Sequence, residues 1–264
     1  MILRHVPAGR RRPDGTGHVD RDALQSRAES VRHTLDGVAK RSLDLVVAAT
    51  LLALLSPLII ALACAIKLES RGPVFHRCRR VGHDGAALAM VKFRKMRRDA
   101  AGLPLTLAGD ERLTRLGRFL AATKLDELPQ LWNVLKGEMS LVGPRPEDPD
   151  LVEVAAHMFA PVLRVKPGMT GLTQLAFARE SRILDPVDTV GDYVRRLLPQ
   201  KVAIDRLYAS RRSLLLDLRI LGWTALTVVL GTEVAVDRAT GRLGVRRRPA
   251  PAPEAATTPQ GGGP

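Results

Sequence analysis

The sequence predicts an α-dominated α+β protein with one membrane-associated helical segment, and three observations support this fold class. The first is a run of 22 residues without a charge, residues 45–66. The second is that apolar residues recur at helical spacing in several segments between residues 110 and 232. The third is a pair of strand-like segments within residues 72–96. With 264 residues, the chain is long enough for one sizeable domain with tails.

The composition restricts the class of partner. The net charge of +14 favours a polyanionic partner, such as nucleic acid, an anionic membrane surface or a phosphorylated substrate. Aromatic residues make up only 3%, which counts against a protein that stacks single-stranded bases. The two cysteines, Cys64 and Cys78, have no metal-binding spacing, and we expect a reducing compartment.

Composition also divides the chain into four parts. Residues 1–37 are a polar lead-in without the apolar stretch of a signal peptide, and residues 38–70 hold the membrane helix. Residues 71–232 form the compact domain with its surface helices. Residues 233–264 are a basic, Pro-rich tail that we expect to be mostly disordered.

The apolar run is long enough for a membrane, but its centre is interrupted. At about 1.5 Å per residue, a straight helix over residues 45–66 reaches roughly 33 Å, the thickness of a bilayer core. Pro57 cannot donate a hydrogen bond to the Ala53 carbonyl, and the neighbouring Ser56 hydroxyl is placed to satisfy that carbonyl instead. Ser56 and Pro57 therefore predict a break in the helix.

The charges on both sides of the run predict its topology. Basic residues precede and follow it: Lys40, Arg41, Lys67, Arg71, Arg77, Arg79 and Arg80. The positive-inside tendency then puts both ends on the cytoplasmic side, which favours a re-entrant helix–break–helix. A Pro-kinked helix that crosses the bilayer is the alternative. Arg41 and Asp44 share one helix face at the start, where we expect a structural ion pair or, less favoured, a substrate contact.

Beyond the membrane segment the elements are short. Residues 72–96 predict a hairpin with a turn at "HDG", and "MSLV" (139–142) predicts a buried strand. The Gly/Pro-punctuated stretch 164–175 is interpreted as a loop. Helices are expected over residues 110–123, 126–136, 192–212 and 213–232. The last of these fits an interfacial helix anchored by Trp223 or, equally, a core helix.

Two adjacent carboxylates, Asp126 and Glu127, are the first candidate site residues. Asp126 falls at the start of a predicted helix, where backbone N–H groups favour an ionised carboxylate suited to covalent phosphoryl chemistry. Glu127 could hold Mg²⁺, a hard cation that prefers oxygen ligands. From spacing alone, however, the favoured interpretation is that Asp126 is a simple helix cap and Glu127 only a partner of the helix dipole.

Basic residues near this pair are candidates for phosphate binding. Arg145 lies between Pro144 and Pro146, and this stiff backbone suits a guanidinium that binds phosphate with two parallel hydrogen bonds. Lys92 and Arg80 belong to a basic stretch, residues 77–98, that fits phosphate, lipid head groups or a solvated face. An incidental surface arginine is the alternative for Arg145.

The sequence resembles the bacterial sugar transferases of the monotopic phosphoglycosyl transferase family, in their small form. The similarity runs from about Lys40 to Leu230 and rests on motifs in the family's order. These motifs are "KRSLD" (40–44), Ser56-Pro57, "VKFRKM" (91–96), "LDELPQLWNVLKGEMSLVGPRPE" (125–147), "VKPGMTGLTQL" (165–175) and "DRLYASRRSLLLDLRIL" (205–221).

The resemblance implies a reaction and a role for each matching position. A nucleotide diphosphate sugar, with uridine as the expected base, would give its sugar-1-phosphate to polyprenyl phosphate through a covalent intermediate on Asp126. Glu127 would hold Mg²⁺, and Arg145, Lys92 and Arg80 would bind phosphate. Ser56-Pro57 would form the re-entrant break, and Arg41 and Asp44 would brace the membrane helix.

The resemblance also implies a cellular setting. The protein would lie in the inner (cytoplasmic) membrane as a monotopic enzyme in contact with membrane lipid, with its catalytic domain on the cytoplasmic face. It would initiate exopolysaccharide, O-antigen or glycoconjugate assembly. A homodimer is a candidate assembly, and nucleic acid is not an expected partner.

Some positions depart from the family pattern. Ala121 and Ala122 stand where basic residues are common, and Lys124 and Lys95 stand where a small hydroxyl residue is usual. These changes are the support for an alternative, a catalytically silent membrane scaffold that keeps the fold. The sequence does not identify the sugar or the glycan pathway.

Overall fold

The structure is a computed structural model that describes residues 21–98, 100, 109–178, 180, 183–185 and 187–246, with side chains from residue 36 onward. Its contacts divide the chain into two units, residues 1–38 and 39–264. In the first unit, residues 21–38 are helical, so the predicted polar lead-in is helical over its second half. Residues 1–20 lie outside the described residues.

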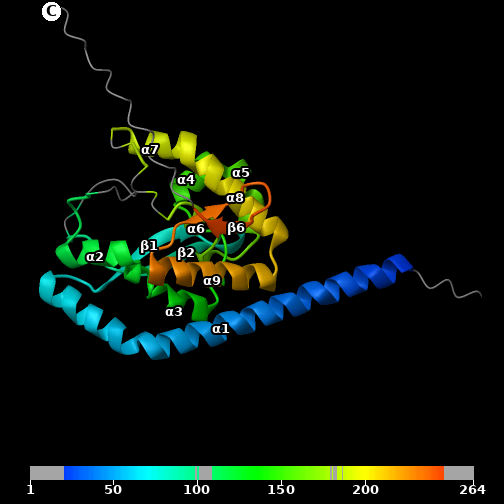
Figure 1. Cartoon of the computed structure of the whole chain (residues 1–264), viewed down its shortest axis with the longest axis horizontal. Helices are drawn as coiled ribbons and strands as arrows, with labels where there is room; N and C mark the ends of the chain where they lie inside the picture. Colours follow the sequence, from blue (N-terminus) through cyan, green and yellow to red (C-terminus); the bar gives the residue numbers. More distant parts are fainter. Residues whose placement is uncertain are drawn as a thin grey trace, which may run out of the picture. The chain divides into compact units, whose positions relative to one another are not determined.

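Helices dominate the second unit, and each described sheet has two strands, as the predicted α-dominated α+β class requires (Figure 1). The helical elements are α1 (Arg21–Glu69, entering from the first unit), η1 (His83–Gly85), α2 (Arg115–Thr123), η2 (Leu125–Glu127), α3 (Gln130–Lys136), α4 (Pro149–Val154), α5 (Ala156–Leu163), α6 (Leu172–Ala176), α7 (Thr189–Asp192), η4 (Tyr193–Leu197), α8 (Leu198–Arg211) and α9 (Leu214–Leu230). The strands are β1 (Phe75–Val81), β2 (Ala87–Phe93), β3 (Ser140–Val142), β4 (Gly168–Thr170), β5 (Val234–Val236) and β6 (Leu243–Val245).

Helix α1 passes through the predicted break without being interrupted. Pro57 lies inside the helix, and the Ser56 hydroxyl donates a hydrogen bond of 2.8 Å to the Ala53 carbonyl, as the sequence predicts. Figure 1 shows that the last turns, drawn in cyan, run in a different direction from the preceding part. A proline without an N–H, compensated by a hydroxyl, is a sufficient cause for this bend.

The hairpin predicted within residues 72–96 is confirmed as the antiparallel pair β1–β2. His76 lies opposite Lys92 in its register. The turn contains Asp84 and Gly85, both with positive φ (51° and 79°), which is the left-handed conformation that Asp and Gly tolerate. The hairpin therefore holds Lys92 at the end of β2 close to the segments that follow.

The parallel pair β3–β4 corrects one prediction. Residues 164–175 were expected to be a loop, but Gly168–Thr170 pairs with Ser140–Val142, and α6 follows directly. A three-residue strand of Gly, Met and Thr has no periodicity to detect, and its pairing depends on a partner far away in the sequence. The strand predicted at "MSLV" is confirmed as β3, fully buried.

The main core lies where α3, β3, α6, α8 and α9 meet, and it includes Leu131, Met139, Val142, Tyr208 and Ile220. Two smaller clusters flank it. One packs α4 and α5 against η4 and α8, around Phe159 and Leu198. The other packs the end of α1 against β2 and α2. The membrane helix and the domain thus share apolar contacts at the end of α1.

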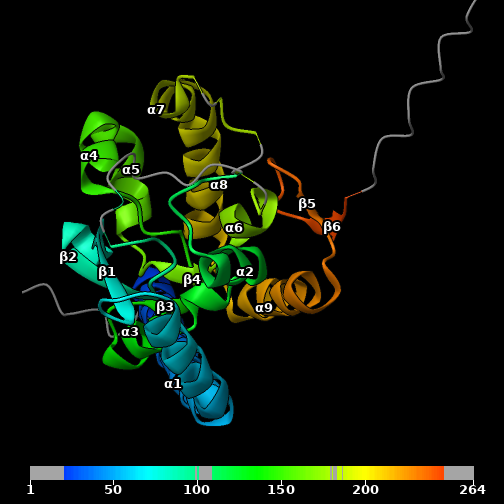
Figure 2. The same ribbon diagram turned by 90° about the vertical axis from the view of Figure 1, so that its left-hand side faces the viewer.

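A surface of exposed apolar side chains covers α1 and α9. Leu54 is 71% exposed and Val229 77% exposed, although both are large and apolar. The same surface includes Val46, Leu58, Ile60, Leu68, Leu215, Leu218, Leu226, Val228 and Leu230. Figures 1 and 2 agree that α3 and α9 lie on the α1 side of the domain, away from α4, α5 and α7. Exposed apolar side chains in this number are typical of a surface that contacts a membrane or another protein.

Within the described residues, one helical stretch, Asp36–Glu69, is long and apolar enough to cross a membrane. Helix α9 is neither a fully buried core helix nor a fully exposed interfacial helix, the two alternatives predicted for it. It buries Asp217 and Ile220 on the domain side, while Trp223 is half-buried and several leucines are exposed. Residues 234–245, assigned by composition to the tail, form the hairpin β5–β6. Residues 247–264 lie outside the described residues.

Candidate active site

The segment that carries Asp126 is a tight turn rather than a helix start. Helix α2 ends at Lys124, which has a positive φ of 61°, and a single 3₁₀ turn over Leu125–Glu127 follows. Helix α3 begins at Gln130, after Pro129, so Asp126 is not its cap. The cap interpretation is therefore wrong. Its physical reason is that Pro129, with no N–H to satisfy, takes the position before the helix.

Asp126 is enclosed, and its two oxygens have different surroundings. The residue is 2% exposed, and its Oδ2 lies 3.7 Å from the Lys95 ammonium. Its Oδ1 is buried and has no hydrogen-bond partner among the described residues. Buried polar atoms are normally satisfied, so an unsatisfied carboxylate oxygen marks a place for an ion, a water or a substrate.

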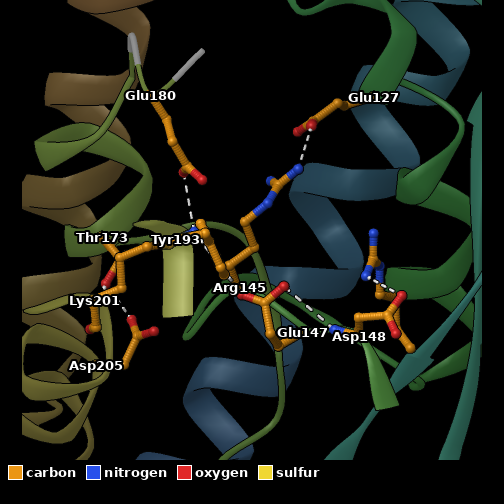
Figure 3. Close-up of polar contacts among 10 residues, drawn as sticks. Glu127, Arg145, Glu147, Asp148, Thr173, Glu180, Tyr193, Lys201 and Asp205 are labelled. Atoms are coloured by element: carbon orange, nitrogen blue, oxygen red, sulfur yellow. Dashed lines mark hydrogen bonds and ion pairs between the residues drawn. The ribbon is translucent and has the colours of Figure 1, made fainter. Parts of the chain in front are cut away.

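Glu127 is held by two cations. Its Oε1 accepts hydrogen bonds from Lys92 Nζ at 3.0 Å and from Arg145 Nη2 at 2.9 Å, and the second contact is drawn in Figure 3. Burial opposes ionisation of Glu127, but Arg145 and Lys92 outweigh it and keep its pKa well below the ordinary value. The Glu127 charge likewise raises the pKa of Arg145, while burial lowers that of Lys92.

The frame around Arg145 depends on two glycines. Gly143 donates to the Thr170 carbonyl at 2.9 Å, and Gly168 donates to the Pro144 carbonyl at 2.8 Å. A Cβ on Gly168 would lie 2.0 Å from the Gly143 nitrogen, so no side chain fits there. The β3–β4 pair therefore fixes the loop that presents Arg145, and the predicted stiffness comes from this contact as well as from the prolines.

Arg80 does not reach the carboxylate pair. Its guanidinium forms an ion pair of 2.9 Å with Asp148, and the Asp148 side chain also caps α4. The structure brings Asp126, Glu127, Arg145 and Lys92 together and assigns Arg80 to a neighbouring contact. Arg80 differs from the other candidates because the carboxylate that it pairs with belongs to the cap of α4 and not to the Asp126–Glu127 pair.

The predicted ion pair between Arg41 and Asp44 is replaced by contacts to the domain. Arg41 donates to the carbonyls of Val134 and Leu135 at 2.7 and 2.9 Å, which closes the end of α3. Asp44 accepts a hydrogen bond of 3.0 Å from the Leu141 nitrogen. Unsatisfied backbone groups bind these side chains more effectively than an exposed partner on the same helix would.

A third residue completes this first anchor of α1. Lys40 forms an ion pair of 2.6 Å with Asp217 on α9 and donates to the Val142 carbonyl at 3.1 Å. The start of the membrane helix is thus bound to α3, β3 and α9 at once.

A second anchor holds the other end of α1. The buried Arg94 donates to the carbonyls of Ser70 and Arg71 at 2.8 and 2.7 Å. Glu69 accepts a hydrogen bond of 2.9 Å from the Leu116 nitrogen at the start of α2. Sequence reasoning missed both contacts, because Arg94 belongs to a run of basic residues in which no single charge is distinguished.

A second group of charged residues, here called the Lys201 cluster, lies on the other side of Arg145 (Figure 3). Lys201 donates to Glu180 at 3.0 Å and to the Tyr193 hydroxyl at 2.7 Å, and that hydroxyl donates to Glu147 at 2.6 Å. Burial raises the pKa of Tyr193, so its hydroxyl stays a donor.

The cluster continues into the core through a buried pair. The Thr173 hydroxyl donates to Asp205, and burial raises the pKa of Asp205 to about 7. Tyr193 and Lys201 lie in an ordinary helical pattern, so no signal in the sequence separates them from core residues. The Lys201 cluster consists of Glu147, Glu180, Tyr193, Lys201, Thr173 and Asp205.

The candidate site has a shortage of metal ligands and an excess of cations. Among the described residues, no group of three His, Cys, Asp or Glu side chains is placed to hold a metal ion. Mg²⁺, however, is often bound by one or two carboxylates together with substrate phosphates and water. The unsatisfied Asp126 Oδ1 and the adjacent Glu127 carboxylate are oxygen donors of the kind that this ion prefers.

Taken together, the fold and the site define a class of protein. A bent apolar helix is attached at both ends to a small α+β domain, which encloses a carboxylate pair among cations. The comparisons identify the class. The bacterial sugar transferase family model matches residues 35–231, and the chain belongs to this family.

Similar proteins carry specific names. The chain is 42% identical over 186 residues to the UDP-glucose:undecaprenyl-phosphate glucose-1-phosphate transferase of Caulobacter vibrioides, covering 69% of this chain and 66% of that one. It is 37% identical to an Aeromonas hydrophila UDP-N-acetylgalactosamine-undecaprenyl-phosphate N-acetylgalactosaminephosphotransferase, covering 73% and 44%. It is 35% identical to the exopolysaccharide production protein PSS of Rhizobium leguminosarum bv. phaseoli, covering 73% and 96%. The chain thus spans most of the third relative but only part of the first two.

Proposed function

We propose that this protein is a membrane phosphoglycosyl transferase that moves a sugar-1-phosphate from a nucleoside diphosphate sugar to polyprenyl phosphate. The observation that carries the proposal is Asp126, a buried carboxylate with one unsatisfied oxygen beside a Glu127 that binds two cations. The names of the similar proteins support a uridine diphosphate sugar as donor and undecaprenyl phosphate as acceptor. The reaction would initiate assembly of an exopolysaccharide or related glycan.

In the first step, a carboxylate oxygen of Asp126 attacks the β-phosphorus of the donor. A bond forms between that oxygen and phosphorus, and the bond from the β-phosphorus to the bridging oxygen breaks. The nucleoside monophosphate leaves with the bonding electrons, and the phosphosugar stays on Asp126 as an acyl phosphate.

In the second step, a phosphate oxygen of the polyprenyl phosphate attacks the same phosphorus. The bond between phosphorus and the Asp126 oxygen breaks, the carboxylate is restored, and the product is a polyprenyl diphosphate sugar. Two displacements at one phosphorus give ping-pong kinetics.

The cations bind the charge that moves during both steps. Arg145 and Lys92 share the carboxylate of Glu127, the residue next to Asp126, and would bind the donor phosphates there. The rigid Arg145 loop fixes its guanidinium, so little reorganisation is needed when phosphate binds. Glu127 would hold Mg²⁺, which when bound screens the donor's charge from the carboxylate nucleophile.

The anchors of α1 support a re-entrant membrane segment on the cytoplasmic face of the inner membrane. Arg41 and Asp44 bind the domain at the start of the apolar run, and Arg94 and Glu69 bind the same domain at its end. Between them, the residues around Pro57 are exposed. A segment with both ends on one domain enters and leaves the bilayer by one face, with α9 at the interface.

The chemistry is tested with radiolabelled uridine diphosphate sugars, undecaprenyl phosphate and Mg²⁺. We expect release of uridine monophosphate with at least one sugar, and labelled phosphosugar on the protein when the acceptor is left out. Asp126→Asn should reduce transfer at least about 10³-fold and remove the label, while the protein stays in the membrane fraction.

Asp84→Asn, in the exposed hairpin turn, is the matched control and should retain full activity. Full activity of Asp126→Asn would exclude this nucleophile. Absence of turnover with every sugar in the panel would instead favour the catalytically silent scaffold.

The topology is tested by cysteine labelling from the two faces of the membrane. Cys64 and Cys78 are first replaced by serine, and single cysteines are placed at Val38 and Leu68, both exposed side chains. We expect an impermeant maleimide to label both positions from the cytoplasmic face only. Labelling of the two positions from opposite faces would establish a spanning helix.

A further inference from the structure

Asp126 has one cation of its own, Lys95. The Lys95 ammonium lies 3.7 Å from Asp126 Oδ2. Within the described part of the chain, Asp126 forms its ion pair with this lysine. The aspartate is almost fully buried, whereas a quarter of the lysine side chain is exposed. A charge pair with one enclosed partner is screened much less by water than a surface pair.

The backbone that carries Lys95 is held in place. Its carbonyl accepts a hydrogen bond of 3.0 Å from the Thr114 nitrogen, and Met96 pairs with Leu113 in an isolated bridge. A Cβ on Gly117 would lie 1.9 Å from the same Lys95 carbonyl, so α2 packs directly on this point. The position of the Lys95 backbone is therefore defined by the fold, and its side chain begins from a fixed point.

The cations of the site are divided between the two carboxylates. Lys92 and Arg145 each donate a hydrogen bond to Glu127, while the Lys95 ammonium donates none to the described residues. Its three N–H donors are thus not committed to a protein acceptor. Three cations around two carboxylates leave an excess of one positive charge, which suits an incoming phosphoryl group.

Lys124 is the basic residue nearest to Asp126 in the sequence, but the structure shows that Lys95, and not Lys124, pairs with Asp126. Lys124 is exposed, and no ion pair joins it to the described residues. Lys95 comes from a distant segment and contacts the carboxylate. Ala121 and Ala122 supply no charge, so the cation on Asp126 comes from Lys95.

We propose that Lys95 is a further catalytic residue of the reaction, an inference that rests on the proposed function. Its ammonium pairs with the Asp126 carboxylate before attack. As the bond from Asp126 to phosphorus forms and the bond to the leaving nucleotide breaks, the negative charge of the carboxylate passes to the oxygen of the leaving monophosphate, while the transferred phosphoryl group keeps its own charge. The Lys95 ammonium stays beside the Asp126 oxygens and pairs with the phosphoryl oxygens as they arrive, which stabilises the covalent phosphosugar.

The test measures how fast labelled phosphosugar appears on the protein in rapid-quench mixing with radiolabelled uridine diphosphate sugar. The variants are Lys95→Met, Lys95→Arg, Lys124→Met and, as a matched control at an exposed lysine outside the site, Lys136→Met. We expect Lys95→Met to slow loading about 10²-fold with a KM within threefold of wild type. Lys95→Arg should recover at least a tenth of the wild-type rate, and the Lys124 and Lys136 variants should load normally.

Three outcomes overturn the inference. The first is loading of Lys95→Met within twofold of wild type, which leaves the proposed function intact. The second is a loss that Lys95→Arg does not recover, accompanied by a lower unfolding temperature, because this pattern indicates a structural role. The third is absence of label on the wild-type protein itself, which overturns the proposed function as well.

Discussion

Arg145 separates two charged groups that differ in how completely they are satisfied. On the Glu127 side, cations outnumber carboxylates and a buried oxygen of Asp126 has no partner. On the other side, Glu180, Lys201, Tyr193 and Glu147 of the Lys201 cluster bind one another in a chain of hydrogen bonds, and Thr173 and Asp205 form a further pair (Figure 3). A group that contains a buried polar atom without a partner is a candidate ligand site, whereas a group whose polar atoms all bind one another stabilises the fold. Charge density alone therefore does not indicate catalysis.

The largest effect expected from this comparison follows Glu127→Gln. Loss of the negative charge leaves Lys92 and Arg145 without their ionic partner and removes the proposed Mg²⁺ ligand. We expect kcat/KM for uridine monophosphate release to fall about 10³-fold, the effect of losing several kcal/mol of charge stabilisation. Added Mg²⁺ should not restore the rate. A variant within tenfold of wild type would mean that Glu127 only neutralises its neighbours.

Lys201→Met should act on stability instead of chemistry. Removing the ammonium leaves Glu180 and the Tyr193 hydroxyl without a shared partner in a buried place. We expect the free energy of unfolding to fall by about 3 kcal/mol, while the folded fraction loads phosphosugar at nearly the wild-type rate. Denaturant unfolding and rapid-quench loading on the same sample provide both values. A hundredfold slower loading at unchanged stability would place Lys201 in the active site.

Tyr193→Phe tests the same cluster with a smaller change. The substitution keeps the ring and removes the hydroxyl that joins Lys201 to Glu147. We expect a loss of about 1–2 kcal/mol in the free energy of unfolding, because two buried groups each lose a hydrogen bond. Thermal unfolding in detergent measures it, and an unchanged unfolding temperature would show that the chain of hydrogen bonds contributes little.

A pH-dependent contribution to stability is expected at Asp205, and it is spread over about three pH units. Burial raises its pKa from 3.8 to about 7 in the folded protein, so between these pH values the folded state binds more protons than the unfolded state. The contribution of Asp205 to stability is complete below about pH 4 and is lost as the pH rises to 7. Asp205→Asn should remove this slope, a difference of up to about 4 kcal/mol across the window. Parallel stability curves for the two proteins would exclude this contribution.

Local signals in the sequence predicted much of the fold. The apolar run, the hydrogen bond from Ser56 to Ala53, the hairpin β1–β2 and the end of α3 at Gly137 are all found in the structure. Each depends on residues that are neighbours in the sequence, which is the range over which periodicity, turn residues and prolines act.

Contacts between distant segments were not predictable in the same way. The pairing of β4 with β3, Lys95 with Asp126 and Arg94 with the end of α1 each join segments that no local pattern connects. The Arg41–Asp44 prediction failed for the same reason, because the groups that bind these two residues come from α3 and β3. The candidate carboxylates could be found from the sequence, but not the division of cations between them.

The two anchors of α1 also fix its helical phase. One residue added between Asp44 and Arg71 would turn everything after it by about 100° and move Glu69 away from α2. Two full turns, about seven residues, would restore the direction but push the end about 10 Å too far. The length of the apolar segment is thus set by the separation of two points on the domain, not by the thickness of a bilayer.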